Sequence, residues 1–175
     1  SKGCLVVAGA GNGVLNSQEI YIGVPLQTLQ DNYPAGSEKA LAIGALTAHD
    51  QRARYSNYGP KVAIYAPGGG TADSQDLQHK CMNSSYPPEL KLQKESCVLV
   101  AHPKDKYWQL DGTSFAAPHV AGVAALIKSQ FPSHSPDQIK QRLLDSADTI
   151  ILHDPNGIPF IAKKLNAQRA VDNVP

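Results

Sequence analysis

Apolar residues along this 175-residue chain gather in short runs that glycine, proline and polar residues separate. Three of these runs, at residues 5–8, 39–45 and 62–66, are almost continuously apolar. Such runs are typical of strands in a parallel sheet that is covered on both faces. Two further segments, at residues 158–161 and 165–171, complete the chain.

A helix is predicted around Ser114. Pro118 has no N–H group and cannot lie deep in a helix, so the helix should begin within about one turn before it. Ser114 then lies at the helix N-terminus, where unpaired N–H groups and the helix dipole favour negative charge. The apolar positions with helical spacing are Val120, Val123, Ala124 and Ile127. Five small residues suit close packing of the helix against a sheet: Gly112, Ala116, Ala117, Ala121 and Gly122.

A second helix is predicted to begin at Ser135. Pro136 occupies its first position, and Gln138 stands where a capping box needs a glutamine or glutamate. The apolar face of this helix would consist of Ile139, Leu143 and Ala147.

Length and composition restrict the class of protein. The chain is long enough for one compact domain and too short for two. With 42% apolar and 18% charged residues it is globular, and a formal net charge of +1 gives no broad electrostatic attraction to nucleic acid or an anionic membrane. No apolar run approaches the length of about 18 residues that spans a membrane. The first residues have the apolar pattern of the middle of a buried strand, so we expect this chain to begin inside a larger fold.

The chain has three cysteines, so a disulfide between any two of them leaves the third without a partner in this chain. Cys81 and Cys97 flank a polar segment and could form a disulfide, with Cys4 left over; three reduced thiols are the alternative. The same segment contains Asn83-Ser84-Ser85, an acceptor sequence for N-glycosylation. This combination favours an oxidising, extracellular environment, and no metal site is expected.

Residues 111–122 read D-G-T-S-F-A-A-P-H-V-A-G. They resemble the nucleophile motif of the subtilisin-like serine peptidases, G-T-S-x-A-x-P-H-V-A-G. The resemblance implies that Ser114 attacks a peptide carbonyl, with its own N–H helping to hold the oxyanion, and that His119 is structural. The alternative for an isolated serine here is a simple helix cap.

Asn12 follows the first predicted strand in the sequence G-A-G-N-G. A dinucleotide-binding loop is excluded because the third glycine is misplaced and no suitably spaced acidic residue follows. The segment resembles the subtilase motif A-A-G-N, in which the asparagine amide is the second oxyanion donor. The alternative is an asparagine that only forms a turn.

The same resemblance implies a substrate pocket. One wall would come from Ala8, Gly9, Ala10 and Gly11, with Gly9 leaving room for a sizeable apolar side chain. Tyr33-Pro34 resembles the family's Y-P turn, whose proline is commonly cis, and Asn32 would lie near the pocket floor. No cofactor is expected to be required. Structural calcium is possible in such a fold, but Thr47 stands where some relatives carry a calcium-binding aspartate, so calcium is not supported at that position.

The resemblance extends from residue 5 to residue 171, apart from enlarged loops at about 13–32 and 71–106. It implies an α/β fold with three layers, in which helices flank a mainly parallel sheet, and it covers only the C-terminal part of that fold. The loop at 71–106 would decorate the rim of the active site.

The family's aspartate and histidine motifs, D-[ST]-G and H-G-T-H-V-A-G, do not occur in this sequence. The remaining histidines match no motif: His49, His79, His102, His134 and His153. A serine needs a base that a carboxylate orients. We therefore predict a serine endopeptidase that is active only with an N-terminal polypeptide carrying Asp and His, made by cleavage of a precursor or supplied separately.

Cys4 is a candidate for a bond to that polypeptide. Secretion, a zymogen stage and binding of a prodomain or inhibitor would accompany such a peptidase. Two other functions stay open: a pseudopeptidase that binds protein segments without cutting them, and a structural fragment.

Overall fold

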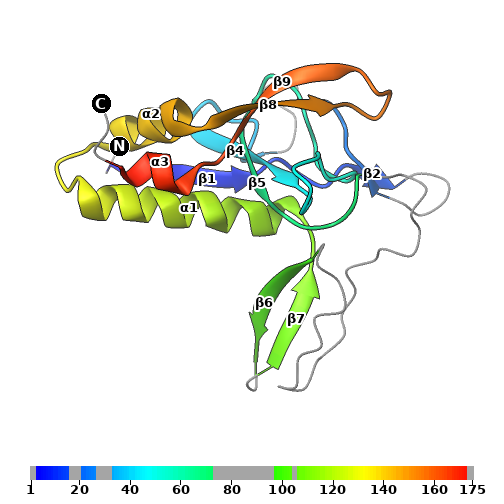
Figure 1. The fold of residues 1–175 in the computed structure, drawn as a ribbon, viewed down its shortest axis with the longest axis horizontal. Coiled ribbons are helices and arrows are strands. Elements are labelled where there is room, and N and C mark those ends of the chain that lie inside the picture. Colours follow the sequence, from blue (N-terminus) through cyan, green and yellow to red (C-terminus); the bar gives the residue numbers. More distant parts are fainter. Residues whose placement is uncertain (1–2, 16–20, 27–32, 73–96, 104–105, 173–175) are drawn as a thin grey trace.

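The computed structural model describes residues 3–15, 21–26, 33–72, 97–103 and 106–172. Its centre is a five-stranded sheet in the order β1-β4-β5-β9-β8 (Figure 1). The strands are β1 Val6–Gly9, β4 Ala40–Leu46, β5 Val62–Pro67, β9 Pro159–Lys164 and β8 Asp148–His153. All neighbouring pairs are parallel except β8 and β9. The α/β class and the mainly parallel sheet are therefore confirmed.

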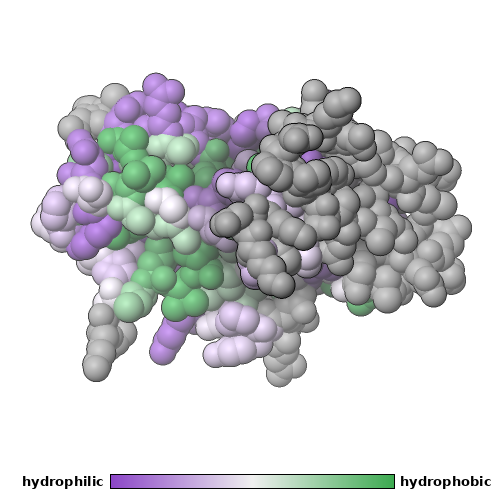
Figure 2. Space-filling view, turned by 90° about the horizontal axis from the view of Figure 1, so that it is seen from below, coloured by the Kyte–Doolittle hydropathy of each residue, from purple (hydrophilic) through white to green (hydrophobic). Residues whose placement is uncertain are grey.

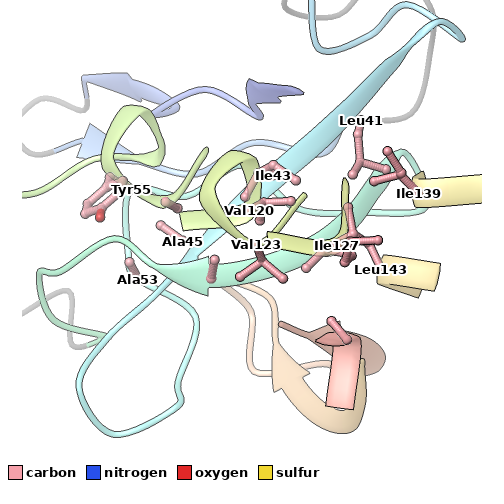
Figure 3. Close-up of a cluster of buried hydrophobic side chains, with 14 residues drawn as sticks. Leu41, Ile43, Ala45, Ala53, Tyr55, Val120, Val123, Ile127, Ile139 and Leu143 are labelled. Atoms are coloured by element: carbon pink, nitrogen blue, oxygen red, sulfur yellow. The ribbon is translucent and has the colours of Figure 1, made fainter. Parts of the chain in front are cut away.

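Three helices cover one face of this sheet in the described part of the chain: α1 Thr113–Gln130, α2 Pro136–Ser146 and α3 Ala167–Val171. They share one hydrophobic cluster with β4 and β5 (Figure 3). Val120, Val123 and Ile127 of α1 face the sheet, as predicted. On the opposite face of the sheet, Ala42 of β4 packs in a second cluster.

Helix α2 begins as its sequence predicts. The hydroxyl of Ser135 accepts a hydrogen bond from the backbone of Gln138, whose side chain accepts one from the backbone N–H of Ser135. The predicted apolar face is also buried, with Ile139, Leu143 and Ala147 all packed inside. Local capping and one apolar stripe are thus enough to define this helix.

Helix α1 differs from prediction in the direction of two small residues. Ala116 is buried, but Ala121 and Gly122 are exposed, and nothing lies within 4 Å of a Cβ added at Gly122. The expectation that they pack against the sheet was wrong, because the helical turn of about 100° per residue directs them away from it. Ala125 and Leu126 are exposed as well, Leu126 by 55%.

We call the surface formed by Ala121, Gly122, Ala125 and Leu126 the outer face of α1. Figure 2 shows apolar residues gathered on the side of the molecule that α1 lines. Beside α1, strand β1 is an edge strand, and no strand among the described residues pairs with its free side. Helix α1, which carries this apolar face, contacts β1, whose other side is paired with β4.

Both enlarged loops contain short hairpins that were not predicted. Val14–Leu15 (β2) pairs with Tyr21–Ile22 (β3), and Val98–His102 (β6) pairs with Lys106–Leu110 (β7). The β6–β7 hairpin projects from the main body, and β7 leads directly towards α1 (Figure 1). No helix in the portion that the structure describes is long and apolar enough to cross a membrane.

Candidate active site

Ser114 is the second residue of α1 and is exposed. The helix cap is Gly112, which makes no side-chain hydrogen bond, so Ser114 does not act as the cap. Pro118 lies in the second turn, close to the predicted limit. The backbone N–H of Ser114 is one of the first four of the helix, which have no acceptor within it. The hydroxyl and this N–H therefore meet at one helix end.

Asn12 reaches the same helix end from the loop after β1. Its Oδ1 accepts hydrogen bonds from the backbone N–H and the hydroxyl of Thr113, each at 2.9 Å. Because Oδ1 is held by two donors, the other end of the amide is Nδ2, an N–H donor. A Cβ added at Gly112 would lie 3.3 Å from that Nδ2. The Asn12 side chain thus binds the residue immediately before Ser114, although Asn12 and Thr113 are 101 positions apart in the sequence.

Thr113 joins the two segments. It is almost fully buried, and its hydroxyl also accepts a hydrogen bond from the backbone N–H of Gly11 at 3.1 Å. Sequence reasoning did not identify Thr113, although it lies inside the nucleophile motif. Its role depends on contact with a distant strand end, which the motif alone does not reveal.

The position before the helix requires a glycine. Gly112 has a φ of 147°, in the region that other residues avoid, and an added side chain would press on Asn12. Asp111, which precedes it, is partly buried, and burial raises the pKa of its carboxyl while Arg54 opposes the shift. The turn therefore combines a special backbone with a carboxylate that is costly to ionise.

The predicted pocket wall needs correction. A Cβ added at Gly9 would lie 2.8 Å from the Thr113 hydroxyl, so Thr113 fills the space that we expected a substrate side chain to use. Ala8 and Ala10 are buried against Leu26 and other residues of the second cluster. Their side chains pack inside the protein, and a pocket at this strand could use only its backbone.

Several predicted positions lie outside the described residues: Asn32, His79, Cys81 and Asn83. Cys97 lies immediately before β6, and its predicted pairing with Cys81 stays a prediction. The Tyr33–Pro34 peptide is cis, as the Y-P turn implied. The Thr47 hydroxyl accepts hydrogen bonds from the backbone N–H groups of His49 and Gln51, which stabilises a turn.

His119 lies on the same helix as Ser114. Its ring nitrogen Nδ1 is 2.8 Å from the carbonyl oxygen of Phe115, one turn earlier. This contact fits the structural role predicted for it. Among the residues that the structure describes, no histidine side chain forms a hydrogen bond with Ser114.

Comparisons with known proteins show the family of this chain. The model of the subtilase family matches residues 1–173. The chain belongs to the subtilase family. It is 31% identical over 150 residues to subtilisin DY of Bacillus licheniformis, covering 86% of this chain and 42% of that protein. It is 38% identical over 116 residues to a thermostable alkaline protease of Halalkalibacterium halodurans, covering 66% of this chain and 25% of that protein.

A solved protease structure shares the fold. A protease from Pseudoalteromonas arctica superimposes with a TM-score of 0.66 at 26% identity, over 97% of this chain and 42% of the other. This subtilase chain therefore spans well under half the length of the relatives named here.

Proposed function

We propose that this chain contributes the nucleophile Ser114 and the oxyanion donor Asn12 to a subtilisin-like serine endopeptidase. The observation that carries the proposal is the pair of hydrogen bonds from Thr113 to Asn12, which brings the amide to the end of the helix that carries Ser114. Family membership gives the reaction class, and the relatives named above are proteases.

In the proposed reaction, a histidine of the N-terminal part removes the proton from the Ser114 hydroxyl. The oxygen attacks the scissile peptide carbonyl, and the negative charge on the carbonyl oxygen is held by the Ser114 N–H and Asn12 Nδ2. One side-chain donor of this kind contributes about 3–4 kcal/mol to transition-state stabilisation. The histidine then gives its proton to the leaving amine, and water releases the acyl group from Ser114.

An N-terminal chain of the same peptidase, carrying the catalytic Asp and His, is the proposed partner. Two observations support it: the sequence has neither of the family's Asp and His motifs, and the described residues leave both the apolar outer face of α1 and one edge of β1 uncovered. A parallel edge strand and an apolar helix face are normally covered in α/β proteins. Cys4 is exposed and unpaired, and is available for a bond to this partner.

We further propose secretion, a zymogen stage with a prodomain or inhibitor, a Cys81–Cys97 disulfide and a glycan on Asn83. These rest on the cysteine spacing and on the glycosylation acceptor in the same loop. Protein or peptide substrates follow from the protease relatives. Thr47 already caps a turn, so calcium at that position is not part of the proposal.

Reaction of the protein from its natural source with a fluorophosphonate tests the proposal. Intact mass analysis should show a second polypeptide together with this one, and a single label on Ser114. Ser114→Ala should abolish both labelling and peptide hydrolysis while leaving the assembly intact. A folded assembly that takes no label would instead indicate a protein-binding pseudopeptidase, and hydrolysis by Ser114→Ala would place the nucleophile elsewhere.

A further inference from the structure

The hydroxyl of Tyr55 lies against the turn that carries the nucleophile. Tyr55 belongs to the connection between β4 and β5 and lies at the end of the core cluster opposite to Ile139 and Leu143 (Figure 3). It is 7% exposed. Its hydroxyl oxygen accepts a hydrogen bond from the backbone N–H of Gly112 at 2.8 Å. As a donor, the hydroxyl has two carbonyl acceptors within reach, with its oxygen 2.7 Å from that of Gly68 and 2.8 Å from that of Gly69.

These contacts fix the peptide that precedes the helix. The Gly112 N–H also donates to the carbonyl of Gly68 at 2.9 Å, so the loop after β5 and the Tyr55 hydroxyl hold it together. Gly112 is followed by Thr113, which binds Asn12, and then by Ser114. A shift of the Gly112 peptide would therefore move both the nucleophile and its contact with the oxyanion donor.

Asn57, two residues after Tyr55, holds the other side of the site. It is fully buried, and its Nδ2 donates to the carbonyl of Ala10 at 2.9 Å. Its own backbone N–H donates to the carbonyl of Gly11 at 3.0 Å, and its Oδ1 accepts from the N–H of Val24. Ala10 and Gly11 immediately precede Asn12, so Asn57 fixes the strand end from which the amide projects.

The segment between these two contacts is itself anchored. The hydroxyl of Ser56 accepts from the backbone N–H of Ala45 in β4. The guanidinium of Arg52 is buried and donates to the carbonyls of Ala53, Arg54 and Ser56. Buried hydrogen-bonded networks of this kind are rigid because an unmade bond is costly. Residues 55–57 are thus a fixed reference for both sides of the site.

We propose that residues 55–57 are a positioning segment: the Tyr55 hydroxyl and the Asn57 side chain set the placement of Ser114 relative to the Asn12 amide. The proposal rests on the proposed function of these two residues. Packing alone would need only the aromatic ring at position 55, whereas the hydroxyl adds a bond to the one peptide that leads into the nucleophile. A misplacement of about 1 Å can slow an enzymatic reaction about 100-fold.

Tyr55→Phe in the assembled protein tests this proposal, because it removes one oxygen and keeps the ring. Gly112 retains its bond to Gly68, so the variant should fold. We expect the rate of fluorophosphonate labelling and kcat to fall roughly ten-fold, with KM changed less than two-fold. Tyr65→Phe is the matched control, since Tyr65 is a buried tyrosine of β5 that packs with Leu152 and Ala162; it should keep the wild-type kcat.

Amide hydrogen exchange gives a second measurement that does not depend on activity. Tyr55→Phe should speed exchange at residues 112–114 relative to Tyr65→Phe, and Asn57→Ser should speed it at residues 10–12 and also lower kcat. The proposal would be overturned if Tyr55→Phe is labelled at the wild-type rate and its amides exchange at the wild-type rate. A wild-type protein that takes no label would overturn the proposed function, and unchanged exchange in both variants would then overturn the positioning role separately.

Discussion

The two ends of the Asn12 side chain have different tasks. Oδ1 binds Thr113 and holds the side chain in place, while Nδ2 is the proposed donor to the oxyanion. A substitution that keeps the first task and removes the second separates them. Aspartate does so, because it keeps Oδ1, has a second oxygen in place of Nδ2 and donates no hydrogen bond when ionised. Its negative charge also repels an oxyanion.

Asn12→Asp should lower kcat at least about 100-fold and leave KM almost unchanged, because the lost bond forms only in the transition state. Steady-state kinetics of the assembled protein on a peptide substrate measure both constants. Asn156→Asp makes the same change in the exposed β8–β9 turn and should be silent. An Asn12→Asp variant with wild-type kcat would mean that Nδ2 does not contact the oxyanion.

Motifs locate Ser114 and Asn12 in the sequence, but they do not reveal what holds them. Thr113 and Tyr55 act through contacts with segments far away in the chain; Tyr55 and Gly112, for example, are 57 positions apart. Gly9 illustrates the opposite error: a glycine in a strand suggested space for a ligand, and the space belongs to Thr113. Close packing of the chain on itself is decided by tertiary structure, which spacing cannot show.

Helix α1 has apolar residues on two of its faces, and only one of these faces packs against the sheet. Ala121 on the outer face adds no contact that the isolated fold needs, since it is exposed. If the N-terminal chain packs here, bulk at this position must interfere with it. The fold of this chain itself should tolerate the change because leucine is a good helix former.

Ala121→Leu should therefore weaken assembly with the N-terminal chain without lowering the helix content of this chain. Size-exclusion chromatography and intact mass analysis of the purified protein measure the bound fraction, and circular dichroism measures the helix. Ala167→Leu introduces the same side chain at an exposed position of α3 and should leave assembly unchanged. Equal assembly of the two variants would argue that α1 is not part of the interface.

Elements differed in how well their sequences predicted them. Strands β1, β4 and β5 are continuously apolar, so a pattern of short apolar runs finds them. Strand β8 is an edge strand in which only Leu152 is buried, and β6 and β7 pair only with each other. Such strands bury too little for a continuous apolar pattern, and polar residues within them resemble a loop.

At the scale of the whole molecule, two tyrosines lie in the core of the sheet and its connections. Tyr65 is 1% exposed and Tyr55 7% exposed, and in both cases burial raises the pKa of the phenol above its ordinary value. Burial disfavours the charged phenolate, so the folded chain keeps protons that the unfolded chain releases in alkali. Global stability therefore depends on pH on the alkaline side.

The sign of this dependence follows from proton binding. Below a pH of about 10, the ordinary pKa of tyrosine, both states keep the protons and stability is complete. Above it the unfolded state binds fewer protons, so the free energy of unfolding falls by up to about 1.4 kcal/mol per pH unit for each such tyrosine.

Tyr65→Phe removes one of these groups, so urea unfolding followed between about pH 9 and pH 11 should show a shallower loss of stability than in the wild type. Tyr33→Phe makes the same chemical change at a tyrosine that is 83% exposed and controls for the substitution itself. Equal slopes for wild type and Tyr65→Phe would mean that Tyr65 releases its proton at the same pH in both states, and that its burial does not persist in solution.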